Sequence, residues 1–272
     1  MNTLRKIVMP AFGVLAILAF QVSSAAPGDP APGPAPGDAA PGVAPGGPAG
    51  PGARGRGGRS STPEHPHNLA PYFTPATSSP KAPDADGFLQ RWLLLDPINK
   101  PNSGNTVFTD TYVRNTFNTE YFPNQFTVVP SDGDKVTVAG EELAWHSLDS
   151  ANFNVKLFRF ADGVNKRTYG VIFWAVTVVN SPREMKNVRL AVGSNAASMW
   201  WLNGKDTVDL FTDRRMVMDD CVSKRLTLNK GRNVLRGAVI NGPGLSDFCV
   251  RFIDENGDPV KDITLTLDSA GN

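Results

Sequence analysis

The sequence has little of the chemistry on which hydrolases and metal sites depend. Its 272 residues include three histidines and two cysteines, and no Gly-x-Ser-x-Gly segment that could form the nucleophile elbow of an α/β-hydrolase. His65 and His67 lie in a Pro- and Gly-rich stretch, which leaves His146 as the histidine in the body of the chain. The sequence therefore predicts neither a Ser-His-Asp triad nor a zinc site built from histidine and cysteine.

An excess of charge of one sign is also missing. Lys and Arg total 27 against 26 Asp and Glu, a net charge of +1, and removal of Arg5 and Lys6 with a leader would leave −1. Such a balance does not predict a nucleic-acid partner. The tract from Arg54 to Arg59 places three arginines among glycines, and we interpret it as solubilising charge.

The apolar run from Ile7 to Phe20 is too short to span a bilayer, which needs about 20 residues, and it contains Pro10. Basic residues before it and small residues up to Ala25 predict a secretory signal peptide over residues 1–25. We therefore expect a secreted or periplasmic protein with no membrane span after cleavage. Residues 26–83, rich in Pro, Gly and Ala, are predicted to form a disordered tether.

Residues 84–272 are predicted to form one all-β domain, an antiparallel β-sandwich. No stretch sustains a helical period for more than two turns, and short apolar runs alternate with Gly, Pro, Asn and Asp. The run 169–179 is apolar on both faces, so we expect a central strand whose outer face is covered by the aromatic-rich segment 108–126. The predicted strands are 88–95, 135–138, 143–148, 169–179, 188–192, 199–202, 221–228, 234–240, 247–253 and 263–267.

One hairpin is the most specific local signal in the chain. Asn203-Gly204 follows Met199-Trp200-Trp201-Leu202, and the Asn-Gly pair favours a type I′ turn. Alternation along the strand predicts that Trp200 and Leu202 face the core and that Trp201 faces outward.

The residues around this hairpin resemble a known class of module. The stretch 191–205, the strand after Asp219-Asp220 and the strand 234–240 are similar to galactose-binding-like jelly-roll domains. With 88–98 and 241–252, the similarity extends over roughly residues 84 to 267 to the non-catalytic N-terminal module of bacterial acetylxylan esterases. The resemblance implies a jelly roll that binds a xylan-like polysaccharide or supports an esterase. The sequence predicts no cofactor, but jelly-roll modules of this kind often hold a structural Ca²⁺ ion, for which Asp219 and Asp220 are the candidate ligands.

Sugar sites combine an aromatic face with hydrogen-bonding side chains, which directs attention to Trp201 and its surroundings. The alternative for Trp201 is packing against the segment 108–126. The candidate ligand-binding residues are Trp201, Asn203, Asp209, Arg214, Arg215 and His146.

The two cysteines, Cys221 and Cys249, lie in predicted strands of an exported chain, where a disulfide is permitted. Alternation predicts that both thiols point away from the core. They would pair if their strands are neighbours, and the alternative is two free, half-buried thiols.

Three functions remain open at this point. The first is the carbohydrate-associated module, and the second is a structural or protein-interaction sandwich with no sugar site. The third is a divergent or truncated acetylxylan esterase.

Overall fold

Fourteen strands and two helices make up the part of the chain that the computed structural model describes, residues 67–100, 109–211, 214–240 and 245–267. The predicted signal peptide, most of the predicted tether and the Asn-Gly-Pro-Gly segment at 241–244 lie outside these residues. No helix within the described ranges is long and apolar enough to cross a membrane.

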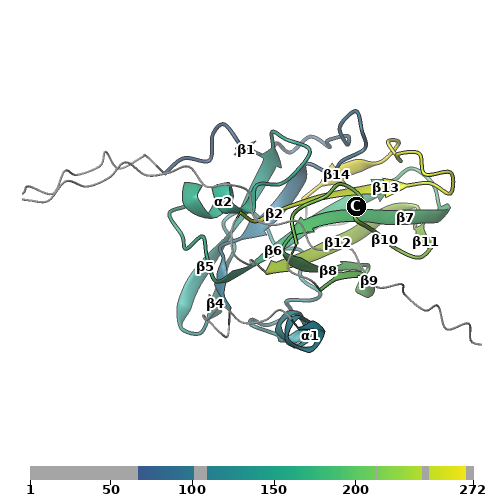
Figure 1. The fold of residues 1–272 in the computed structure, drawn as a ribbon. Coiled ribbons are helices and arrows are strands. Elements are labelled where there is room, and N and C mark those ends of the chain that lie inside the picture. Colours follow the sequence, from purple (N-terminus) through teal and green to yellow (C-terminus); the bar gives the residue numbers. More distant parts are fainter. Residues whose placement is uncertain (1–66, 101–108, 212–213, 241–244, 268–272) are drawn as a thin grey trace, which may run out of the picture. The chain divides into compact units, whose positions relative to one another are not determined.

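The strands form two sheets, and every pairing is antiparallel (Figure 1). The larger sheet runs β1 (Phe73–Pro75), β5 (Glu141–Ser150), β2 (Arg91–Leu95), β6 (Val171–Ser181), β12 (Gly231–Ile240), β8 (Ala197–Leu202) and β9 (Lys205–Leu210), with β3 (Ile98–Asn99), β4 (Lys135–Val138) and β14 (Thr264–Thr266) attached. The smaller sheet contains β7 (Met185–Asn195), β10 (Cys221–Val222), β11 (Leu226–Leu228) and β13 (Asp247–Ile253).

The inner faces of the two sheets enclose one apolar core, which confirms the predicted all-β, antiparallel sandwich. From the larger sheet, Trp92 and Trp200 enter this core, and from the smaller sheet Phe248 meets both of them at ring-centroid distances of 5.0 Å. Val188, Leu190 and Val192 supply the apolar face that alternation predicts for β7. The core therefore lies between the sheets, as in other sandwiches.

A second apolar cluster covers the outer face of the larger sheet. Trp174 of β6 packs against Phe126, 5.7 Å between centroids, under helix α1 (Asp110–Asn118) and the chain that follows it. This confirms the cover predicted from the aromatic-rich segment, within which α1 spans nine residues. Its first turn is capped by Thr109, whose Oγ1 accepts a hydrogen bond from the backbone N–H of Tyr112.

Three strands, β1, β3 and β9, lie where the sequence does not predict them. Strand β1 falls inside the predicted tether because the buried ring of Phe73 packs 6.3 Å from Phe160 of helix α2 (Leu157–Gly163), so the folded body begins before residue 84. Strand β9 carries two aspartates, which disfavour strands, yet its Val208 and Leu210 are buried in the core.

The predicted strand 221–228 is divided into β10 and β11 by Ser223. Its hydroxyl donates to the carbonyl of Lys224 and accepts from the N–H of Leu190 at 2.8 Å. The Ser223 hydroxyl thus accepts the Leu190 N–H in place of a backbone carbonyl, which interrupts the regular pairing between the two short strands.

Candidate ligand groove

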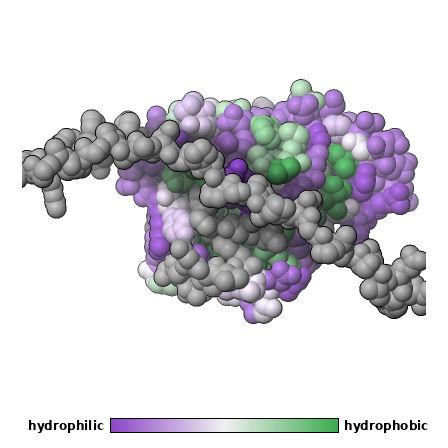
Figure 2. All heavy atoms as spheres, viewed as in Figure 1, coloured by the Kyte–Doolittle hydropathy of each residue, from purple (hydrophilic) through white to green (hydrophobic). Residues whose placement is uncertain are grey.

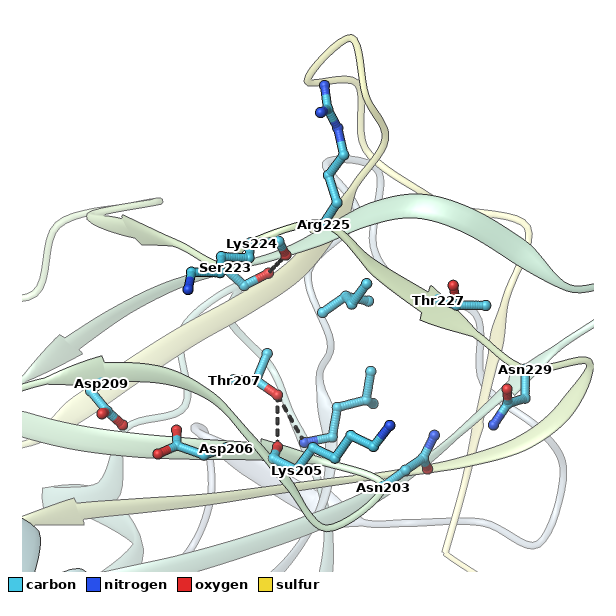
Figure 3. A pocket seen from close by; sticks show the side chains of 12 residues that line it. Asn203, Lys205, Asp206, Thr207, Asp209, Ser223, Lys224, Arg225, Thr227 and Asn229 are labelled. Carbon is cyan, nitrogen blue, oxygen red and sulfur yellow. Dashed lines mark hydrogen bonds between the residues drawn. The ribbon is translucent and has the colours of Figure 1, made fainter. Parts of the chain in front are cut away.

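A groove of about 720 Å³ lies where the edge of the larger sheet faces the smaller one (Figure 3). Strand β9 and the hairpin before it form one wall, and the segment 223–229 forms the other. Leu202 and Leu226 are the apolar side chains among its lining. The groove is lined by Leu202, Asn203, Lys205, Asp206, Thr207, Asp209, Ser223, Lys224, Arg225, Leu226, Thr227 and Asn229.

Asn203 fixes the hairpin at one end of the groove. Asn203 has φ 51° and Gly204 φ 75°, which is the backbone that a type I′ turn requires. The amide of Asn203 donates to Asn233 Oδ1 at 3.0 Å and accepts from the N–H of Val234 at 2.8 Å. These bonds tie the hairpin to β12, so Asn203 lines the groove and also holds its wall in place.

A β-bulge explains why two acids three residues apart lie together. Trp201 pairs with Asp206 and Trp200 with Val208, so Thr207 is an extra residue in β9. Asp206 and Asp209 are thereby both turned toward the face that carries Trp201, and they lie side by side in Figure 3.

Arg114 of α1 binds both of these acids. Its Nη2 donates to Asp209 at 2.9 Å, and its Nη1 lies 3.7 Å from Asp206. Burial and the neighbouring Asp209 raise the pKa of Asp206, while Arg114 opposes the shift. The sequence singles out Asp209 but misses Asp206 and Arg114, because neither the bulge nor the contact with α1 has a local sequence signal.

Trp201 faces outward as alternation predicts, and Trp200 and Leu202 face the core. The indole of Trp201 is nevertheless 7% exposed, stacked on Trp174 at 5.5 Å and edge-on to Phe126. The cover over the outer face leaves it no open face, so the structure places Trp201 in packing, the alternative reading, and not as a platform for a sugar. Its edge reaches a separate small cavity of about 240 Å³.

The rim residues after β9 are held in arginine–carboxylate pairs. Arg214 Nε lies 2.9 Å from Asp220, and Arg251 Nε donates to Asp219 at 3.0 Å. Arg215 is exposed. Both candidate calcium ligands thus already have a cationic partner, and no group of three or more His, Cys, Asp or Glu among the described residues could hold a metal ion.

The same segment lies against a glycine of β7. A Cβ on Gly193 would be 2.9 Å from the carbonyl carbon of Val217 and closer still to its oxygen. The backbone of the 214–220 segment can approach the sheet here because position 193 has no side chain.

The structure does not bring His146 to the groove. It lies on β5, and five strand spacings of the sheet, roughly 24 Å, separate β5 from β9. Its Nε2 donates to Asp96 at 2.9 Å, and Asp96 also accepts from the N–H of Ala144 and faces Lys166 at 3.4 Å. Burial tends to raise the pKa of Asp96, but these hydrogen bonds and charges outweigh it and hold the pKa below 3.8.

This shift predicts a pH dependence. A carboxyl whose pKa is lower in the folded state stabilises the fold above pH 3.8, and that contribution disappears as the pH falls through the folded pKa. We expect Asp96→Asn to flatten the loss of unfolding free energy below about pH 4, measured by urea unfolding at several pH values. The exposed Glu184→Gln should leave the slope unchanged, and an unchanged slope in Asp96→Asn would contradict the assignment.

The predicted disulfide is not formed, and both cysteines are free. Cys221 of β10 and Val250 of β13 both pair with Val192 of β7, so β10 and β13 lie on opposite sides of β7. Cys249 pairs with the next residue of β7, Gly193. Their strands are therefore not neighbours, and a bridge would require the backbone to move. The orientation of Cys221 is also corrected, since it packs against the main core.

Because both cysteines are free thiols, we expect a reducing agent to leave the thermal unfolding midpoint unchanged. Burial raises the pKa of Cys249 to about 11 and raises that of Cys221 too, so both thiols should react slowly with a thiol reagent until the protein unfolds. Titration of two thiols in denaturant checks this. A midpoint that falls on reduction would show that a bridge exists.

Comparison with known proteins gives only distant likenesses. No family model matches the sequence, and no curated protein matches it. Among solved structures, the PA14 sugar-binding domain from an RTX adhesin is 10% identical, with 64% of this chain and 96% of that chain covered and a TM-score of 0.35. The A domain of epithelial adhesin 9 from Candida glabrata, in complex with Galβ1-4GlcNAc, is 11% identical, with 74% and 99% covered and a TM-score of 0.33.

A β-glucosidase from Kluyveromyces marxianus is 17% identical over 62% of this chain, with a TM-score of 0.30, and this chain spans 15% of its length. The assignment to an antiparallel β-sandwich rests on the strand pairing of this chain itself.

Proposed function

We propose that the protein is an exported, non-catalytic carbohydrate-binding module whose site is the groove between β9 and the segment 223–229. The observation that carries this proposal is the groove itself, about 720 Å³ and lined mainly by amide, hydroxyl and charged side chains. Its size falls within the range of small-ligand sites, roughly 300 to 1,000 Å³. Xylan-like polysaccharide is the ligand that the acetylxylan esterase resemblance suggests.

The groove can contact both the hydroxyl groups and the apolar C–H face of a sugar ring. Sugar hydroxyls both donate and accept hydrogen bonds, and Asn229 and Thr227 present groups of both kinds. Neither side chain has a hydrogen-bond partner among the described residues, so both are free for a ligand. Leu202 and Leu226 can contact the apolar C–H face of a sugar ring in the absence of an aromatic platform.

Isothermal titration of the purified protein with xylo-oligosaccharides and acetylated xylan tests the proposal, with acetate release followed in parallel. We expect the protein to bind the sugars without releasing acetate. The double variant Asn229→Ala/Thr227→Val removes two hydrogen bonds to the sugar and should lower the affinity roughly tenfold. The matched control is Asn256→Ala in the exposed turn after β13, which should bind as the parent does. Equal binding by the groove variant would move the site elsewhere, and acetate release would restore the esterase alternative.

A second candidate function is docking on another exported protein, such as an esterase. Three apolar side chains, Val217, Met218 and Val222, are 55%, 46% and 37% exposed. They lie close together on the smaller sheet, because Val217 lies over Gly193 of β7 and Val222 pairs with Ala191, two residues away on the same strand. On the face viewed in Figure 2, hydrophobic side chains gather in separate areas among hydrophilic ones. Docking without a sugar site predicts no heat with any glycan in the titration above.

A further inference from the structure

The two walls of the groove differ in charge. The sequence from Cys221 to Ser246 contains no aspartate or glutamate but five basic residues, Lys224, Arg225, Lys230, Arg232 and Arg236. This acid-free stretch supplies the whole wall 223–229. That wall is therefore electropositive or neutral along its length.

The opposite wall adds another cation to the groove. Lys205 is exposed and its amino group lies in the gap between the two walls in Figure 3, whereas Arg225 points away from the gap. Among the described residues, none forms an ion pair or hydrogen bond with the amino group of Lys205 or of Lys224. Both ammonium groups are available to a ligand.

The two acids of the groove do not offset these lysines. The bulge at Thr207 turns Asp206 and Asp209 toward α1, where Arg114 binds them at 3.7 and 2.9 Å. An arginine shared by two carboxylates neutralises part of their charge and holds it on the outer face of the sheet. The groove is left with two unpaired ammonium groups, and the charge of its two carboxylates is partly neutralised by Arg114.

On the basis of the carbohydrate-binding function proposed above, we propose that the groove selects acidic glycans, in which Lys205 on one wall and Lys224 on the other bind anionic substituents on the sugar chain. A carboxylate on a uronic acid residue and a sulfate ester both supply the required oxygen anion. Neutral parts of the chain would lie along Thr227 and Asn229. Charge complementarity of this kind sets specificity, because an uncharged ligand leaves the ammonium groups without a partner.

Titration with matched oligosaccharides tests the inference. The probes are a neutral xylo-oligosaccharide, the same backbone with a glucuronic acid branch, its uronate methyl ester, and a sulfated form of the backbone. We expect the uronate or the sulfate form to bind about five- to tenfold more tightly than the neutral form and the ester, and the advantage to shrink as NaCl increases. The two acidic probes tell a carboxylate ligand from a sulfate ester.

Lys205→Gln/Lys224→Gln should remove the preference for the acidic probe while affinity for the neutral one changes little. The control is Lys135→Gln on β4, where Lys135 forms an exposed ion pair with Glu142 of β5, and this variant should keep the preference. Equal affinity for neutral and acidic probes would overturn the charge selection and leave the proposed function standing. Binding of none of them would overturn both, and equal binding of a DNA oligonucleotide of the same charge would show a general polyanion surface instead.

Discussion

Gly237→Ala is expected to lower the free energy of unfolding by about 2 to 3 kcal/mol, although it adds a single methyl group. Gly237 pairs directly with Trp200 across β12 and β8, and the indole lies over the glycine. A Cβ at this position would be 2.5 Å from Cε3 and Cη2 of the ring and closer still to Cζ3. Trp200 is fully buried between Trp92 and Phe248, so it has nowhere to move. Urea unfolding followed by tryptophan fluorescence measures the loss.

The double variant Gly237→Ala/Trp200→Leu separates this steric effect from any other cost of alanine. Removal of the indole vacates the space that the new methyl needs, so the two losses should not add. The variant Trp200→Leu alone leaves a cavity and gives the reference. If the losses add fully, contact with the ring is not the cause.

Arg91→Met is expected to cost about 3 to 5 kcal/mol, because it removes the buried guanidinium from a largely buried carboxylate, Asp149, and leaves that carboxylate only the partly exposed Lys81 at 3.4 Å. Arg91 is 2% exposed and binds Asp149 through Nε at 2.8 Å and Nη2 at 3.0 Å. The same guanidinium donates to the Ser79 carbonyl and to Thr77 Oγ1 at 3.2 Å. It thus fastens the chain after β1 to the sheet, and the loss should appear both in urea unfolding and as faster proteolysis near residues 76–81.

The control is Arg183→Met, because Arg183 and its partner Asp262 are 64% and 47% exposed. An exposed pair of this kind contributes about 0 to 1 kcal/mol. The double variant Arg91→Met/Asp149→Leu should recover much of the stability, since the buried carboxylate is then gone and the charge left without a partner, Lys81, is partly exposed to solvent. A loss at Arg91 no larger than that at Arg183 would refute the role of the buried pair.

Local patterns predicted most of the strands. The runs 135–138 and 247–253 coincide with β4 and β13, and the Asn-Gly turn and the opposite faces of Trp200 and Trp201 follow from backbone geometry and alternation. These features depend on residues close in sequence. The missed strand β9 shows the limit, because its aspartates oppose the strand while burial of Val208 favours it.

The groove could not be predicted in the same way, because it exists only where two sheets meet. The sequence points to Asp209 without Asp206, since the bulge that brings the two carboxylates together is visible only in the pairing of β8 with β9. His146 lies near the other end of the sheet from Asp209, and no local pattern in the sequence indicates this separation. The expected disulfide required β10 and β13 to be neighbours, and β7 lies between them.

Gly193 can also serve as a marker when related sequences are compared. Its missing side chain is what lets the carbonyl of Val217 rest on β7, and with it the segment that carries Arg214 and Asp220. In a homologue with any larger residue at this position, that segment must take another path over the smaller sheet. The arginine–carboxylate pairs at this rim should therefore be inherited together with the glycine and disappear together with it.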